Sequence, residues 1–213
     1  YFAYDTKKSG AITVSHLRSS PHPIRSTYLV DRASFVACHQ FEFVDKIDVL
    51  EHAAPGARFL LNAPNAPGGV WDSLPREMQE QMVEKEVRFF AIDAYALAKK
   101  VGMGGRINTI MQTCFFGISG ILPREEAVAH IKKAIEKSYG KRGPEVVKRN
   151  CEVVDLALAH LHEIEVPKAG GATRSRAPLV SHKAPDFVQK VTAVMLAGKG
   201  DLLPVSAFPV DGT

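Results

Sequence analysis

The sequence predicts an α/β fold: a Rossmann-like, mainly parallel sheet flanked by helices, with a helical second half and an extended C-terminal linker. Three observations support this prediction. Short runs rich in β-branched and aromatic residues fill the first third of the chain. Strand-like and helix-like segments then alternate, which favours parallel strands joined by crossover helices. Finally, 213 residues are enough for one sizeable α/β domain followed by a tail.

The first third contains four strand-like runs separated by Gly, Pro and Asp. They are YFAY, AITVSHLR, STYLV and SFVAC, which begin at residues 1, 11, 26 and 34. Alternation in the second run predicts a strand with one solvent-facing side, whereas the apolar SFVAC is typical of a strand buried on both faces. An amphipathic helix is predicted over about residues 41–53, because Phe43, Ile47 and Leu50 fall on one stripe.

The next segment predicts a strand–helix–strand–helix order. The run ARFLLNA, residues 57–63, is the first strand. A helix is predicted to begin near Ser73, which would be its N-cap, with Pro75 in the first turn. The run VRFFAID, residues 87–93, predicts a buried strand, and Asp93 is placed to cap the helix AYALAKKV that follows.

Beyond GMGG, at residues 102–105, the sequence predicts helices only. The run RINTIMQTCFFGIS is apolar almost all round, which indicates a central, buried helix. Further helices are predicted over about residues 124–138 and from Pro144 onward. Residues 167–184 are rich in Gly, Pro, Ser and basic residues and predict a linker, followed by a short helix over about residues 185–196.

Composition narrows the class of function. A scattered net charge of +4 fits a small anionic ligand or an acidic neighbour and argues against nucleic acid. No apolar run reaches the roughly 20 residues of a membrane span. Cys38, Cys114 and Cys151 lie far apart, which predicts reduced thiols in a cytoplasmic protein. Without a C-x-x-C spacing we expect no iron–sulfur cluster or zinc site here, and no catalytic residue is identified.

The best candidate for a binding site is the turn DTKKSG. Lys7 and Lys8 supply positive charge, while the Ser9 hydroxyl and the backbone N–H groups around Gly10 supply hydrogen-bond donors. This combination suits a phosphate group. The same residues also suit a solvated turn between two strands, and their spacing leaves both interpretations open.

The other glycine and histidine patterns carry weaker signals. GMGG follows a predicted helix, whereas the dinucleotide-binding fingerprint needs a preceding strand, so Gly102 is better explained as the residue that ends that helix. GKGD, residues 198–201, lacks the rest of a Walker A motif. His160 and His162 are two residues apart and would face different sides of a helix, which disfavours a shared metal ion.

Six stretches, taken together, resemble pyruvate:ferredoxin (flavodoxin) oxidoreductases, in the domain that corresponds to the gamma subunit of 2-oxoacid:ferredoxin oxidoreductases. The stretches are YDTKKSGAITVSHLR, FVACHQFEFVDKIDVL, FLLNAP, GMGGRINTIMQTCFFGISGILPREEA, SYGKRG and APDFVQKVTAVMLAGKGDLLPVSAFPVDGT. The resemblance runs along nearly the whole chain.

The resemblance implies part of a multidomain, cytoplasmic enzyme. Such an enzyme converts pyruvate, coenzyme A and oxidised ferredoxin or flavodoxin into acetyl-CoA, carbon dioxide and the reduced acceptor. It implies a homodimeric parent, with thiamine pyrophosphate, Mg²⁺ and 4Fe–4S clusters in other domains. It also gives the cationic turn a target, since the phosphates of coenzyme A suit Lys7, Lys8, Ser9 and Gly10.

The resemblance also divides the chain. Residues 1–166 would be the gamma-type α/β domain, without its first strand–loop–helix unit, and residues 167–213 a linker with a short helix leading to the next domain. We therefore expect a piece of a longer polypeptide with an unpaired sheet edge. Two alternatives stay open: a purely structural module between domains, without ligand contact, and an independent Rossmann-like enzyme that uses GMGG as its nucleotide loop.

Overall fold

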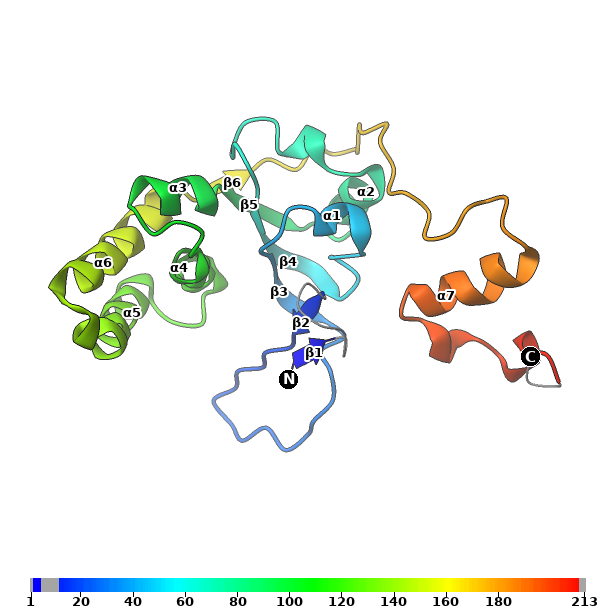
Figure 1. Cartoon of the computed structure of the whole chain (residues 1–213), viewed down its shortest axis with the longest axis horizontal. Coiled ribbons are helices and arrows are strands. Elements are labelled where there is room, and N and C mark those ends of the chain that lie inside the picture. Colours follow the sequence, from blue (N-terminus) through cyan, green and yellow to red (C-terminus); the bar gives the residue numbers. More distant parts are fainter. Residues whose placement is uncertain (1, 5–11, 211–213) are drawn as a thin grey trace.

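A four-stranded sheet forms the centre of the computed structural model, which describes residues 2–4 and 12–210 (Figure 1). The strands lie in the order β3-β4-β5-β6. Their bounds are β3 Ala33–Cys38, β4 Ala53–Asn62, β5 Arg88–Ile92 and β6 His162–Ile164. The first three strands run parallel, and β6 pairs antiparallel with β5. This mainly parallel sheet, flanked by helices, confirms the predicted α/β fold.

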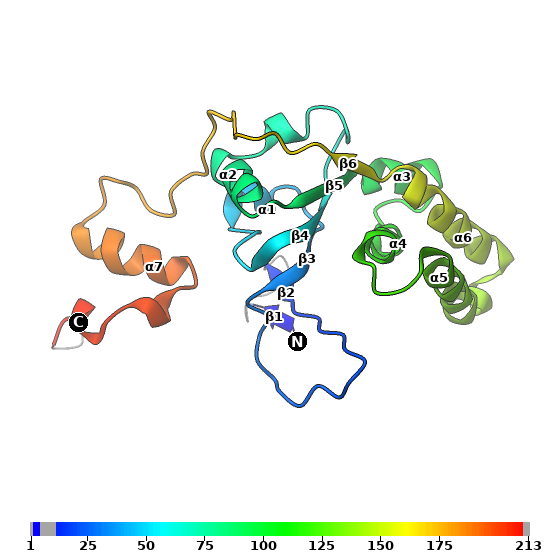
Figure 2. The same cartoon turned by 180° about the vertical axis from the view of Figure 1, so that it is seen from behind.

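Helices cover both faces of the sheet. The short α1 (Phe43–Lys46) and α2 (Arg76–Glu84) lie on one side, whereas the helical half lies on the other (Figures 1 and 2). That half consists of α3 (Ala94–Lys100), α4 (Asn108–Ser119), α5 (Arg124–Tyr139) and α6 (Pro144–Ala159). Because both faces are covered, the central strands are apolar at successive positions instead of alternating with polar residues.

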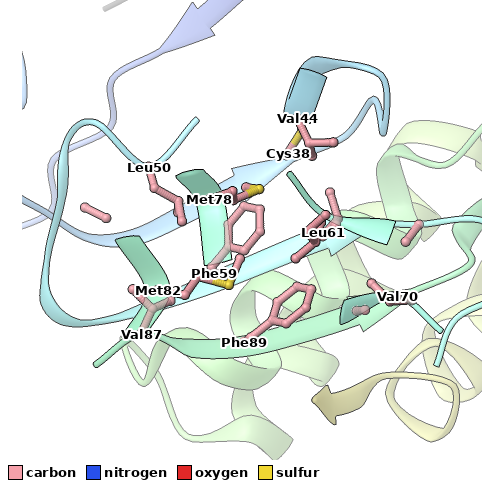
Figure 3. Close-up of a cluster of buried hydrophobic side chains, with 14 of the residues drawn as sticks. Cys38, Val44, Leu50, Phe59, Leu61, Val70, Met78, Met82, Val87 and Phe89 are labelled. Carbon is pink, nitrogen blue, oxygen red and sulfur yellow. The ribbon is translucent and has the colours of Figure 1, made fainter. Parts of the chain in front are cut away.

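The side chains of β4 and β5 divide between two cores. Phe59 and Phe89 point toward α1 and α2, where their rings stack with centroids 5.5 Å apart (Figure 3). Leu60 and Phe90 point the other way, into the cluster built with α3, α4 and α6. This alternation follows from the two-residue period of a strand, and it makes each of the two strands part of both cores.

The region between β3 and β4 differs from the prediction of a helix over residues 41–53. The helix α1 spans only four residues, because Ile47 already has extended backbone angles (φ −138°, ψ 163°). Leu50 is fully buried, so the apolar stripe correctly marked a core position although the backbone there is not helical. The strand β4 begins at Ala53, and a register shift against β3 accommodates the extra residues before Arg58.

Two further local predictions are wrong. Ser73 does not cap α2: it ends a 3₁₀ turn at Trp71–Ser73 and its hydroxyl donates to the Val70 carbonyl (2.6 Å), while α2 begins after Pro75. The run STYLV forms no strand, and Tyr28 is 63% exposed. A β-rich run without a neighbouring strand to pair with does not become a strand.

The sequence also led to two other wrong predictions: that β3 is buried on both faces, and that no strand follows GMGG. Only Cys38 of β3 is buried, because β3 forms an edge of the sheet and not an inner strand. β6 interrupts the second half that was expected to be helical only; its three residues form a strand because β5 offers a partner edge. The prediction of a buried α4 holds only as far as Cys114, which is buried together with Ile110 and Met111.

The first and last described elements do not belong to the four-stranded sheet. At the beginning, β1 (Phe2–Tyr4) pairs antiparallel with β2 (Thr13–Ser15). At the other end, the predicted short helix is confirmed as a π-helical turn, Val188–Thr192, continued by α7, Ala193–Leu196. Figures 1 and 2 show α7 on an arm apart from the sheet. Among the described residues, no helix combines the length and apolarity that crossing a membrane requires.

We predict that the two buried thiols are inert in the native protein. Burial raises the pKa of Cys38 to about 11 and that of Cys114 to about 12. Only thiolates alkylate rapidly, so at pH 8 the raised pKa lowers the reactive fraction about a hundredfold for Cys38 and about a thousandfold for Cys114. Iodoacetamide labelling, followed by peptide mass spectrometry, should therefore modify Cys38 about a hundredfold and Cys114 about a thousandfold more slowly than in urea. Equal rates in native and unfolded protein would contradict their placement.

Candidate functional site

The carboxyl ends of the parallel strands form the edge of the sheet at which a ligand site is expected. In open α/β sheets, ligands bind in the loops that follow these ends. Here that edge is formed by the residues after β3, the loop 63–70 after β4, and Asp93 after β5. Three parallel strands therefore bring three separate stretches of sequence together.

Asn62 joins these three strand ends. Its side chain is almost fully buried (3% exposed) at the last position of β4. The amide nitrogen donates to the His39 carbonyl (3.0 Å), and the amide oxygen accepts from the backbone N–H of Ala94 (2.9 Å). Because it bonds to the residues that follow β3 and β5, Asn62 fixes the spacing of all three ends. The sequence analysis did not identify this residue.

Asp93 fixes the loop after β4 against the start of α3. One carboxylate oxygen accepts from the N–H of Ala96 (2.8 Å), which confirms the predicted helix cap. The other oxygen accepts from the N–H of Asn65 (2.9 Å), which has a left-handed backbone (φ 59°). A third link ties β3 to α3, since Gln40 donates to the Tyr95 hydroxyl (3.1 Å). These polar groups hold the loops in place.

The thiol and imidazole at this edge do not form a catalytic pair. The Cys38 thiol donates to the Gln40 carbonyl (3.1 Å), and burial raises its pKa to about 11, so it stays protonated at neutral pH. Desolvation lowers the pKa of His39 from its ordinary value, although much of the residue is exposed. The thiol proton is engaged by a backbone carbonyl and not by the His39 ring, so the two side chains are not arranged as nucleophile and base.

The GMGG loop ends a helix, as predicted. Gly102 has a left-handed backbone (φ 73°), its N–H bonds to the Lys99 carbonyl, and the N–H of Met103 bonds to the Ala98 carbonyl (2.8 Å). This is the Schellman arrangement that ends α3. Gly104 is also left-handed (φ 64°), and a Cβ added there would meet no other atom within 4 Å. Backbone conformation, and not close approach of another group, therefore explains these glycines.

The predicted phosphate-binding residues Lys7, Lys8, Ser9 and Gly10 lie outside the described residues. The strands on either side of them, β1 and β2, form an antiparallel pair. His16, which follows β2, accepts from the N–H of Val30 (3.1 Å), and its ring centroid lies 6.1 Å from that of His52. Because His52 directly precedes β4, this end of β2 lies at the amino-terminal edge of the parallel strands, opposite to Asn62.

The remaining titratable residues do not assemble into a metal centre. Within residues 2–4 and 12–210, no group of three or more His, Cys, Asp and Glu side chains could hold a metal ion. Cys38 and Cys114 belong to the two different cores on opposite faces of the sheet, so they cannot ligate one cluster. His160 lies against the Leu156 carbonyl (2.9 Å), and His162 belongs to β6.

Comparison with known proteins places this chain among oxidoreductases. A model described as "Pyruvate ferredoxin/flavodoxin oxidoreductase" matches residues 1–160, and a "Domain of unknown function" matches residues 173–213. A pyruvate-flavodoxin oxidoreductase from Rhodospirillum rubrum is 56% identical over 215 residues, and one from Nostoc sp. is 48% identical over 220. A pyruvate:ferredoxin oxidoreductase from Moorella thermoacetica is 42% identical over 212 residues. Each alignment covers 100% of this chain but 18% of the relative.

Among solved structures, pyruvate oxidoreductase subunit PORC from Thermotoga maritima aligns over 64% of this chain and 67% of its own, with 20% identity and a TM-score of 0.49. The sequence relationships are much stronger. The model match covers most of the chain, and the relatives align with all of it, so the chain belongs to the pyruvate ferredoxin/flavodoxin oxidoreductase family.

Proposed function

We propose that this chain is the portion of a pyruvate:ferredoxin or pyruvate:flavodoxin oxidoreductase that contributes to coenzyme A binding and to domain assembly. The whole protein would convert pyruvate, coenzyme A and oxidised acceptor into acetyl-CoA, carbon dioxide and reduced acceptor. Family membership supports the reaction, and the chain spans 18% of the length of its relatives. The protein would act in the cytoplasm as a homodimer, with ferredoxin or flavodoxin as its partner.

The observation that carries this proposal is the engagement of the polar groups at the carboxyl edge. Their hydrogen bonds hold the loops in place: this is the case for Asn62, Asp93 and Gln40. Cys38 and Cys114 lie in separate cores on opposite faces of the sheet, so they do not fit ligation of one iron–sulfur cluster. We therefore place thiamine pyrophosphate, Mg²⁺ and the 4Fe–4S clusters in other domains and assign this chain a scaffolding and binding role.

Coenzyme A binding is assigned to the cationic turn. Coenzyme A carries a pyrophosphate and a 3′-phosphate, and two adjacent lysines followed by a hydroxyl and a glycine N–H match such an anionic ligand. We propose that Lys7 and Lys8 hold the phosphates, with Ser9 and Gly10 as neighbouring donors. The alternative is a purely structural module, in which no ligand touches residues 1–166 and the region from 167 onward packs on other domains.

Domain assembly is assigned to the open edge of β3. This strand is six residues long and contains neither a charged residue nor a proline, and no other described strand pairs with its free edge. The opposite edge, β6, is only three residues long and carries Glu163, which pairs with Arg88 (2.9 Å). Proteins usually protect edges as β6 is protected. We propose that a strand from elsewhere in the polypeptide, from the expected strand–loop–helix unit, pairs with β3.

We predict that changing Lys7 and Lys8 together to Ala raises the KM for coenzyme A and leaves the KM for pyruvate unchanged. Losing about 1.5 kcal/mol, as for one hydrogen bond to a charged group, raises the constant by about tenfold. Steady-state kinetics and calorimetric titration of the full polypeptide with coenzyme A provide the measurement.

The matched control is the Lys99→Ala, Lys100→Ala pair at the end of α3. Both lysines are exposed, and the pair removes the same charge from another place. We expect it to change the KM for coenzyme A by less than about twofold, which is the size of a general charge effect. If the Lys7, Lys8 variant behaves like this control, the structural alternative is correct.

The assembly proposal predicts the hydrogen exchange of β3. Successive amides of a strand point to opposite neighbours, so an edge strand leaves every second N–H without a strand partner. In the full polypeptide, all amides of residues 34–38 should be protected, because a second strand bonds the outer set. Residue-resolved exchange mass spectrometry would show alternate fast amides if β3 remains an edge.

A further inference from the structure

The first half of the predicted linker is bound to the central sheet and its covering helices, called here the α/β body. Residues 170–176, called here the docked segment, lie against α2. Gln79 of α2 is almost fully buried (1% exposed), and its amide oxygen accepts from the N–H groups of Gly171 and Ala172 (2.9 Å each). Its amide nitrogen donates to the Trp71 carbonyl (2.8 Å). Gln79 thus uses its side chain to hold an otherwise irregular stretch of backbone.

Two arginines of the docked segment also bond to the α/β body, one with an exposed side chain and one with a largely buried side chain. Arg174 bonds to Asp45 and to the Ser73 carbonyl, but its side chain is 46% exposed. Arg176 is only 17% exposed, and its Nε donates to the Val44 carbonyl (3.1 Å). The backbone N–H of Arg176 donates to Glu77 (3.2 Å). Arg176 therefore enters the body, whereas Arg174 lies on its surface.

Three buried polar atoms around Arg176 lack a hydrogen-bond partner in the described part of the chain. They are Arg176 Nη2, Asp48 Oδ1 and Gln81 Oε1. The atoms belong to one cluster, because Gln81 Nε2 donates to Asp48 Oδ2 (2.8 Å) and Arg176 Nη2 lies 3.7 Å from Asp48 Oδ1. That last distance is too long for a hydrogen bond. Leaving one buried donor and two buried acceptors unsatisfied is unfavourable.

We propose that Asp48, Gln81 and Arg176 bind one buried water molecule, which fixes the docked segment to the body. A water molecule can accept from Arg176 Nη2 and donate to both Asp48 Oδ1 and Gln81 Oε1. Three hydrogen bonds are the usual number for a buried water. The site joins three separate stretches: the chain after α1, helix α2 and the docked segment. It rests on these contacts alone and is independent of coenzyme A binding.

The cluster at Arg176 lies beyond the residue at which the first family match ends. The first family match ends at residue 160 and the second begins at residue 173, near the start of the region predicted to be a linker. In the structure, hydrogen bonds to the body continue to Arg176. The hydrogen bonds described within residues 177–184 stay inside the arm, as from Lys183 to Ser181. The arm that follows is linked back to the residues before β4 by the ion pair between Lys199 and Glu51 (3.1 Å), so the docked segment is the stretch that hydrogen bonds hold against α2.

Hydrogen exchange of paired variants tests the cluster. In the full polypeptide, Arg176→Met should speed exchange of the amides of residues 170–176 by about tenfold, which corresponds to about 1.4 kcal/mol. Arg174→Met is the matched control, with the same change two residues away at a more exposed side chain, and should change it less than about threefold. Unchanged protection of β4 and β5 shows that the body remains folded. Equal effects of the two variants would overturn the assignment of Arg176 as the fixing residue.

A high-resolution structure of the full polypeptide tests the water itself. We expect a solvent peak within hydrogen-bonding distance of Asp48 Oδ1, Gln81 Oε1 and Arg176 Nη2, and we expect the Asp48→Leu variant to lose it. A direct bond between Arg176 and Asp48, with no solvent peak between the three side chains, would refute the hydration site.

Discussion

The structure depends on the parallel pairing of β3, β4 and β5. A parallel sheet needs crossover connections, and their helices bury both of its faces. Phe59 and Phe89 therefore belong to one core, and Leu60 and Phe90 to the other. The same pairing aligns the three carboxyl ends, which Asn62 then joins. Burial also raises the pKa of Cys38 and of Cys114, and the polar groups at the carboxyl edge hold loops in place.

This support has two features through which it can contact the rest of a larger protein. One is the uncharged edge of β3, with which no other strand in the described part of the chain pairs and which contrasts with the short, charged β6. The other is the arm after Arg176, which follows the docked segment and is also tied to Glu51 through Lys199. Both follow from the central sheet: the first is its unpaired edge, and the second is anchored to a helix that covers one of its faces. A chain spanning 18% of its relatives is expected to expose such contacts.

The sequence predicted those parts of the fold that depend on local signals. The apolar runs of β4 and β5, the Asp93 cap and the helix end at Gly102 each have a signal within a few residues. The errors occurred where a distant partner decides the outcome. β6 needs the edge of β5, STYLV lacks a partner, and Asn62 gains its role only when three strand ends meet. Gln79 and the docked segment were missed because a polar helix position and a Gly-rich stretch both suggest solvent exposure.

We propose that this chain supplies charge for binding coenzyme A and no reacting group. The most direct measurement is the structure of the full polypeptide with coenzyme A bound. Our account predicts that phosphate oxygens of coenzyme A lie within hydrogen-bonding distance of Lys7 and Lys8, with the thiol end directed to another domain. Phosphates held entirely by residues outside this chain would contradict it.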